Sequence, residues 1–299
     1  MATPSPFTKL YAGEEAAGFI SASLLSGETL AKGNITVLPN VTFKVNLKSF
    51  DFADDSVADA TCDFADGSAV SYVEKALTPE NFKLQKELCK KDWLATYAGA
   101  SMRAGVDGTL PANFQEYIIG HAGALVGQQV EKSIWAGDTG TSGQFDGFQV
   151  LLAADGAVVD VAGTTITAGN VIGELGKVRD AILDANYGQE DLAIYVGTGV
   201  MKHYVSAQGA LGYLDQYHAG VTEANFEGTK IVLAPGMGAD KMVAARKSNL
   251  FFATDLASDM AEVKVIDMTE NDGSDNVRLV MKWNAGVGYA NGSDIVYYA

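Results

Sequence analysis

The chain has 299 residues, 47% of them hydrophobic, which is enough to bury a sizeable core in roughly two domains. Its 37 acidic and 21 basic side chains give a net charge of −16. Such a surface repels phosphate groups and therefore disfavours general nucleic-acid binding.

Residues 1–40 show weak periodicity with scattered serine, glycine and proline, which predicts an extended arm with little core of its own. Residues 36–49 are strand-like, because apolar and polar side chains alternate from Val41 to Leu47. The N-terminus lacks the basic and apolar regions of a signal peptide. No apolar run in the chain approaches the roughly 18 residues of a membrane span, so we expect no membrane partner.

Residues 50–72 are acidic and contain no lysine or arginine. Their six aspartates are Asp51, Asp54, Asp55, Asp59, Asp63 and Asp66. Because aspartate and glycine favour turns, we predict a protruding loop or long hairpin with an acidic end. A calcium site is the alternative, since hard cations bind several carboxylates, but the EF-hand order of ligands is absent. We therefore predict no metal site.

The next segment reverses the sign of the charge, although three glutamates dilute it. Its lysines are Lys75, Lys83, Lys86, Lys90 and Lys91. An acidic projection beside a basic segment suggests pairing between neighbouring copies of the chain. Two ordinary solvated faces are the alternative interpretation.

The clearest predicted element is a helix over Asn113–Trp135. Asn113 is a candidate N-cap, and Glu116 completes a variant of the capping box. An apolar face repeats every four residues. It consists of Ile118, Ala122, Val126, Val130 and Ile134, with Leu125 beside them. The helix forms a rod of about 33 Å at 1.5 Å per residue, and a glycine-rich segment from Gly137 ends it.

The remainder of the chain alternates helix and strand before becoming strand-rich. A second helix is predicted from Val171 to Ala185 with Asn170 as its cap, and a third near Gly199–Ala207. The predicted strands are Leu192–Val196, Lys230–Ala234, Lys241–Ala245, Glu262–Ile266, Val277–Trp283 and Ile295–Tyr298. The predicted fold class is α+β.

No constellation of residues indicates catalysis. His121, His203 and His218 are scattered and have no zinc-binding spacing. We expect His121 to make a partly buried polar contact, and the other two to lie near the surface. The segment Gly197–Lys202 sits where a dinucleotide-binding turn would, but it lacks the third glycine. We interpret it as a strand-to-helix turn and Gly236–Lys241 as a β-turn. We predict no catalytic, cofactor-binding or metal-binding residue. Free thiols are the default expectation for Cys62 and Cys89, and one disulfide between them is the alternative.

Taken in order, these elements resemble the major capsid proteins of tailed bacteriophages, with the Hong Kong 97 phage-type fold. The resemblance spans nearly the whole chain and is carried by the order and length of the elements. Two motifs add to it, because such proteins often follow the long helix with an aromatic-x-Gly-Asp turn and a glycine-rich loop. Trp135-Ala-Gly-Asp138 and Gly143–Phe148 look like this turn and loop.

The resemblance implies five parts. They are an N-terminal arm (1–40), an E-loop with its flanking strands (41–92), a peripheral domain (93–167) with the spine helix 113–135, an inserted axial domain (168–258), and returning strands of the peripheral domain (259–299). It also implies a structural subunit, not an enzyme. Such a subunit self-assembles as hexamers and pentamers into the icosahedral virion capsid, in the host cytoplasm, around double-stranded DNA.

The implied partners are further copies of the chain together with portal, scaffolding and decoration proteins. Packaged DNA would be a neighbour by proximity and not by specific binding. Because Met1 lies directly before the arm, we expect any scaffold to be a separate protein. The lysine–asparagine pair that cross-links some family members has no match in this chain.

Two other functions fit parts of the pattern. One is an encapsulin-type nanocompartment shell, which shares the fold but encloses a cargo enzyme. The other is a soluble α/β enzyme acting on a small molecule, which only the turn at Gly197 and Gly199 motivates.

Overall fold

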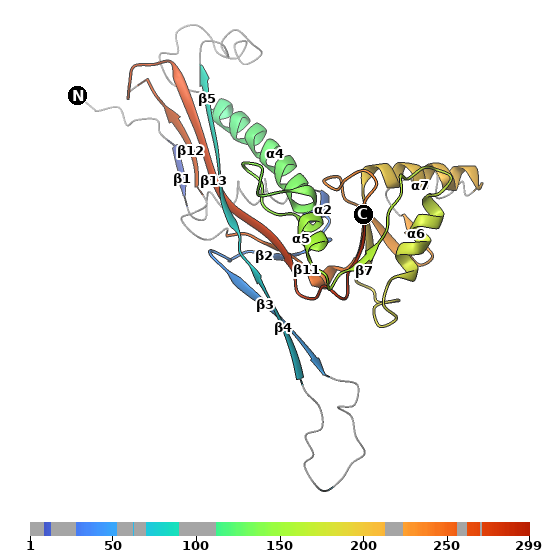
Figure 1. Cartoon of the computed structure of the whole chain (residues 1–299). Coiled ribbons are helices and arrows are strands. Elements are labelled where there is room, and N and C mark those ends of the chain that lie inside the picture. Colours follow the sequence, from blue (N-terminus) through green and yellow to red (C-terminus); the bar gives the residue numbers. More distant parts are fainter. Residues whose placement is uncertain are drawn as a thin grey trace.

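The structure is a computed structural model. It describes residues 9–12, 28–52, 62, 70–89, 112–212, 224–255, 262–269 and 271–299. The described residues form two sheets with few helices, and a two-stranded hairpin that projects from them (Figure 1). The predicted α+β class is confirmed.

The first sheet is built around one long strand. Its order is β1 (Lys9–Ala12), β12 (Glu262–Asp267), β13 (Asn276–Tyr289), β11 (Leu250–Ala253) and β2 (Thr36–Leu38), with β5 (Glu80–Cys89) also paired to β13. Alternate side chains of β13 point into the core, so Val277, Leu279 and Met281 are buried while Arg278 is exposed. The strand pairs with β12 and β5, and it continues beyond the predicted end at Trp283 to pair with β11 as well.

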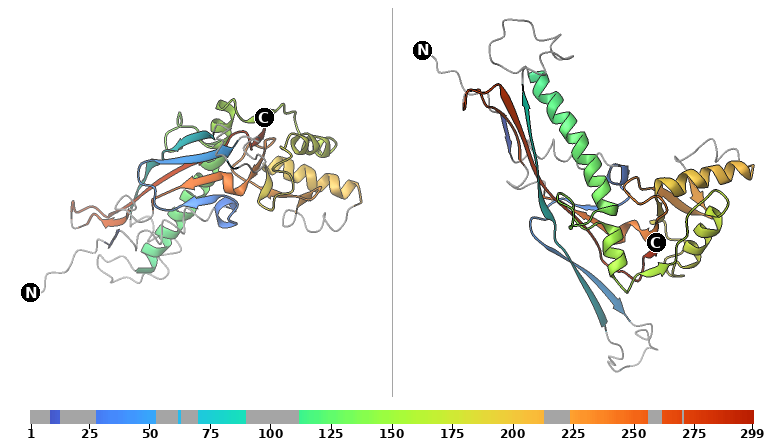
Figure 2. Two further views of the ribbon diagram at one scale, coloured as in Figure 1. Left: turned by 90° about the horizontal axis from the view of Figure 1, so that it is seen from below. Right: turned by 45° about the horizontal axis from the view of Figure 1, so that its top comes forward.

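Helix α4 (Ala112–Ala136) runs along this sheet, as the two views of Figure 2 also show. All five side chains of the predicted apolar face are buried, and they share one core with β12 and β13. Two details differ from the sequence-based predictions. The helix begins at Ala112, so Asn113 lies inside the first turn and is not the cap. Leu125, at the edge of the apolar stripe, is half exposed.

Two short helices close the end of α4. Helix α2 (Glu28–Ala31) and helix α5 (Phe148–Ala154) both contribute to the same core. Leu30 and Ile35 are buried in it, so the described residues 28–38 are more than an arm without a core. The sequence did not indicate this burial or helix α2, because the apolar side chains that complete this core lie in distant parts of the chain.

The second sheet lies between α4 and α5 on one side and two further helices on the other. Its order is β6 (Val159–Val161), β14 (Val296–Tyr298), β10 (Met242–Arg246), β7 (Leu192–Val196), β9 (Thr229–Leu233) and β8 (Asn225–Phe226). A single-turn helix η3 (Lys247–Asn249) links β10 to β11. We expected Ile295–Tyr298 among the strands of the peripheral domain, but β14 pairs with β10 and β6 instead.

Strand β7 is buried on both faces, which explains its continuous apolar sequence. Ala193 and Tyr195 face the core of α4, whereas Ile194 and Val196 face helices α6 (Val171–Asp180) and α7 (Thr198–Ala210). Helix α6 ends at Asp180, so it is shorter than the helix predicted from Val171 to Ala185.

Asn170 does occupy the N-cap position of α6, but its side chain makes no capping bond. Its Oδ1 accepts the backbone N–H of Thr167 at 2.7 Å. The segment before the helix is therefore folded back on itself, and the helix end is not capped by a side chain.

The hairpin of β3 (Val45–Phe52) and β4 (Val70–Leu77) leaves the body at the β4–β5 connection and extends away from both sheets (Figure 1). In the described part of the chain these two strands form a separate two-stranded sheet. The protruding hairpin predicted for this region is confirmed at its base. Most of the acidic segment 50–72, including Asp54, Asp55 and Asp66, lies outside the described residues.

Candidate functional site

The residues that sequence analysis considered for chemistry do not come together. His121 is exposed on α4, so its expected partial burial is wrong, and His203 is half-buried on α7. His218 lies outside the described residues. Among the residues that the structure describes, no group of three histidine, cysteine or acidic side chains could hold a metal ion. Cys62 and Cys89 are free thiols, which is the default of the two alternatives.

The two glycine-rich turns pack against each other. A Cβ atom at Gly197 would lie 2.1 Å from the carbonyl oxygen of Gly238, so glycine is required there. The N–H of Val200, in the first turn of α7, donates to the carbonyl of Ala239 at 3.1 Å. A phosphate group at a helix N-terminus needs such N–H groups. Here the neighbouring turn already uses one of them.

These turns therefore have the structural roles predicted for them. Gly197 connects β7 to α7 as a strand-to-helix turn. The N–H of Lys241 bonds the carbonyl of Gly238 at 3.2 Å, which closes a β-turn. No helix in the described ranges is both long and apolar enough to span a membrane.

The hairpin presents aromatic side chains to solvent. Phe50 and Tyr72 are cross-strand partners whose ring centroids lie 5.4 Å apart, edge to face. Their exposed fractions are 62% and 69%. Phe43, just before β3, and Val73 are exposed as well. Grouped exposed apolar side chains usually mark an interaction surface, and an isolated two-stranded hairpin is only marginally stable in water.

The two faces of the hairpin differ at its base. Leu47, Lys75 and Leu77 share one face, and Phe50 and Tyr72 lie on the other. Leu47 and Leu77 are buried against the body with Val41 and Ala253. The face that anchors the hairpin is thus distinct from the face that carries the exposed aromatic pair.

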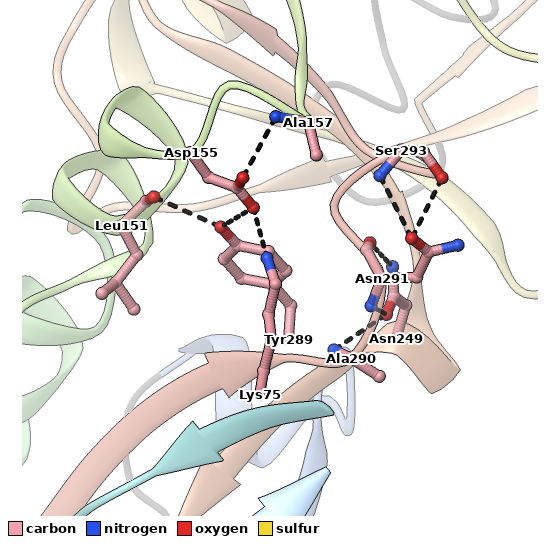
Figure 3. Close-up of polar contacts among 9 residues, drawn as sticks. All are labelled: Lys75, Leu151, Asp155, Ala157, Asn249, Tyr289, Ala290, Asn291 and Ser293. Atoms are coloured by element: carbon pink, nitrogen blue, oxygen red, sulfur yellow. Dashed lines mark hydrogen bonds and ion pairs between the residues drawn. The ribbon is translucent and has the colours of Figure 1, made fainter. Parts of the chain in front are cut away.

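A polar junction ties this base to the body (Figure 3). Lys75 on β4 forms an ion pair with Asp155, which follows α5, and its Nζ lies 3.8 Å from the ring centroid of Tyr289 on β13. The hydroxyl of Tyr289 donates to Asp155 Oδ2 at 2.8 Å and lies 3.2 Å from the carbonyl oxygen of Leu151. The backbone N–H of Ala157 donates to Asp155 Oδ1 at 3.0 Å.

The chain beyond Tyr289 is held by two asparagines. Asn249 accepts the backbone N–H groups of Ala290 and Asn291 at 3.1 and 2.9 Å, and it donates to the carbonyl of Asn291 at 2.7 Å. Asn291 in turn accepts the backbone N–H and hydroxyl of Ser293 (Figure 3). This network fixes the end of β13 and with it the position of Tyr289.

The charges at the junction shift two pKa values. The hydrogen bonds from Lys75 and from the backbone N–H of Ala157 lower the pKa of Asp155 to about 2, and the Tyr289 hydroxyl and the charge of Lys75 add to the effect. Burial raises the pKa of Tyr289 well above its ordinary value, and the carboxylate of Asp155 adds to that effect. At neutral pH Asp155 is therefore a carboxylate and Tyr289 a neutral phenol.

Replacing Asp155 with asparagine should remove a pH-dependent contribution to stability. Because the pKa of Asp155 is lowered from 3.8 to about 2 on folding, that contribution is complete above about pH 4 and is lost as the pH falls towards 2. We expect the variant to be less stable by about 1 kcal/mol at pH 7, a value reduced for partial solvent exposure, and by about half of that at pH 3. Urea unfolding at both pH values measures the difference.

Asp180→Asn is the control, because Asp180 is an exposed carboxylate paired with its neighbour Arg179. The free energy of unfolding could differ between the unaltered chain and Asp155→Asn by as much at pH 3 as at pH 7. That result would contradict the assignment of the effect to the carboxylate.

Comparison with known proteins identifies the fold. No protein-family model and no curated protein sequence matches the chain. A solved structure from Mycobacterium phage Adephagia matches with a TM-score of 0.59 and 16% identity over 93% of each chain. The satellite phage P4 procapsid matches with a TM-score of 0.56 and 13% identity, over 94% of this chain and 97% of the other. A virus-like particle from Pyrococcus furiosus matches with a TM-score of 0.55 and 12% identity, over 96% and 99%.

These similarities establish the architecture. The chain shares the fold of these phage capsid and procapsid structures, which is the Hong Kong 97-type fold. The identities are low, so the shared property is the fold.

Proposed function

We propose that this chain is the major capsid protein of a tailed bacteriophage, a structural subunit and not an enzyme. Copies of it assemble as hexamers and pentamers into an icosahedral shell around double-stranded DNA. The observation that carries the proposal is the extent of the structural match, which covers more than 90% of this chain and of the Adephagia and P4 chains. The exposed aromatic hairpin supports it, because that surface requires a partner.

In this proposal α4 is the spine helix and the β3–β4 hairpin is the E-loop. The E-loop lies over a neighbouring copy and buries Phe50 and Tyr72 there. The arm, peripheral and axial domains keep the bounds predicted from the sequence, with three strands exchanged: β6 and β14 belong to the second sheet, and β11 belongs to the first. The net charge of −16 fits an inner wall that lets packaged DNA slide instead of holding it.

The further partners of the proposed subunit are a portal, a scaffolding protein and decoration proteins. We place the protein in the virion capsid after assembly in the host cytoplasm. Packaged DNA contacts the shell by proximity.

Electron microscopy of the purified full-length chain tests the proposal. Closed icosahedral shells or capsomer rings are the expected result. A monodisperse monomer that never assembles, with or without a coexpressed scaffold, would refute it.

An encapsulin-type shell is the second candidate, favoured by the match to the Pyrococcus furiosus virus-like particle, which covers 99% of that chain. Genes for a portal or a terminase beside the gene for this chain would support the phage capsid. A neighbouring gene for a cargo enzyme, together with protein-filled particles free of DNA, would support the nanocompartment.

A further inference from the structure

We propose that Lys75, Asp155 and Tyr289 form a clamp that fixes the angle at which the β3–β4 hairpin leaves the body. When the clamp opens, the hairpin swings about an apolar hinge at its base. The mechanical part of this inference stands on the contacts within one chain. Its consequence for a shell rests on the proposed function.

The hinge is a small apolar contact. Leu47 and Leu77 pack on Val41 and Ala253, and β13 passes closely behind them. A Cβ atom at Gly288 would lie 3.0 Å from Leu77 Cδ1, and one at Gly286 would lie 2.9 Å from Pro79 Cα. The two glycines therefore give the hairpin base a nearly flat backbone surface. Apolar contacts have no preferred direction, so this surface does not by itself set the angle of β4. The hydrogen bonds of Val41 and Thr42 with the body hold the chain before β3.

The clamp supplies the missing direction. Lys75 lies two residues beyond Leu77 on the same face of the hairpin, and it reaches across to Asp155 and the ring of Tyr289. Charge-assisted hydrogen bonds are short and directional. Further out on β4, Val73 and Tyr72 are exposed. Lys75 is thus the outermost described contact through which β4 meets the body.

The body side of the clamp is fixed by the body's own contacts. Ala157 holds one oxygen of Asp155, and the other accepts the hydroxyl of Tyr289, which also lies close to the carbonyl of Leu151. Asn249 holds the backbone directly after Tyr289 (Figure 3). Loss of Lys75 therefore leaves Asp155 and Tyr289 in place, and what changes is the range of angles that the hairpin can adopt.

In a shell made of hexamers and pentamers, neighbouring subunits meet at more than one angle. A hairpin that lies over a neighbour must follow these angles, and the strength of the clamp then limits the range of shell geometries. We expect a chain without the clamp to form shells of less uniform diameter.

Distance measurements between the hairpin and the body test the clamp. We would replace Lys48, exposed on β3, with cysteine in a Cys62→Ser background, and attach spin labels there and at the native Cys89 on β5. Pulsed electron resonance on full-length, unassembled subunits gives the distribution of distances. Lys75→Met should raise the share of molecules whose label-to-label distance lies outside the main peak of the unaltered chain. The expected increase is roughly tenfold, the effect of losing one charge-assisted hydrogen bond. Lys75→Arg should keep most of the original distribution.

Lys83→Met is the matched control, because it removes the same charge from an exposed position of β5 and should leave the distribution unchanged. Tyr289→Phe, which keeps the ring and removes the hydroxyl, should give an intermediate width. A Lys75→Met distribution as narrow as that of Lys83→Met overturns the clamp. Far-ultraviolet circular dichroism checks that each variant is folded.

Electron microscopy of the same variants separates the two inferences. A widened distance distribution in a chain that never forms shells supports the clamp and refutes the proposed function. Shells formed by a chain whose distances do not respond to Lys75→Met support the function and refute the clamp.

Discussion

Replacing Trp135 with alanine should destabilise the protein by about 4 kcal/mol, the range for a fully buried large aromatic side chain. The Trp135 ring is completely buried, and its centroid lies 5.4 Å from that of Phe148 and 5.2 Å from that of Tyr195. Its Nε1 donates to the Thr29 hydroxyl at 3.0 Å. Truncation would therefore open a cavity where α2, α4, α5 and the second sheet meet. Urea unfolding of the full-length chain measures the loss.

Leu125→Ala provides the control on the same helix, since that side chain is half exposed and its removal should change stability by less than about 0.5 kcal/mol. Trp135→Phe should fall between the two, because it keeps an aromatic ring and loses the bond to Thr29. Equal stabilities of Trp135→Ala and Leu125→Ala would show that the packing around Trp135 does not hold the two sheets together.

Replacing Phe50 and Tyr72 together with serine should abolish shell assembly while leaving the subunit folded. Both side chains are mostly exposed in the single chain, so their loss should alter its stability by no more than about 0.5 kcal/mol. In a shell each would be buried against a neighbour, which contributes roughly 2 kcal/mol per ring, repeated at every hairpin. Particle yield after sedimentation, with unfolding of the unassembled variant in parallel, measures both effects.

Tyr72→Phe is the matched variant, because it keeps the ring and should assemble normally. A double serine variant that assembles with full yield would place the contact between subunits elsewhere. A double variant that no longer folds would show that the ring pair supports the hairpin itself, contrary to its exposure.

Local patterns predicted the elements well. Ile118, Ala122 and Val126 repeat at helical spacing, and this is sufficient for a helix face because neighbours on it are near in sequence. Strand β7 was predicted with its exact bounds, because its continuous apolar run is also a pattern within one short segment. The errors lie at the ends and edges of elements, where the local pattern is weakest. Examples are the length of β13, the early end of α6, and the exposure of Leu125.

The junction at the hairpin base could not be predicted in the same way. Lys75 was recognised only as one of several lysines in a basic segment, and neither Asp155 nor Tyr289 stood out. Lys75 and Asp155 are 80 positions apart, and Asp155 and Tyr289 are 134 apart. Nothing in the local sequence indicates such a pairing, since it depends on how β4, α5 and β13 come together.

The amino-acid sequence by itself determined the long helix, the order of helices and strands, the acidic charge and the absence of a recognisable catalytic motif. These properties depend on residue type and on spacing within one element. Only the tertiary structure decided that β14 completes the second sheet, that the two glycine turns pack on each other, and that Lys75 meets Asp155 and Tyr289. Those contacts join residues far apart along the chain. Apolar burial brings the segments together, but the sequence of one segment does not specify which other segment it will meet.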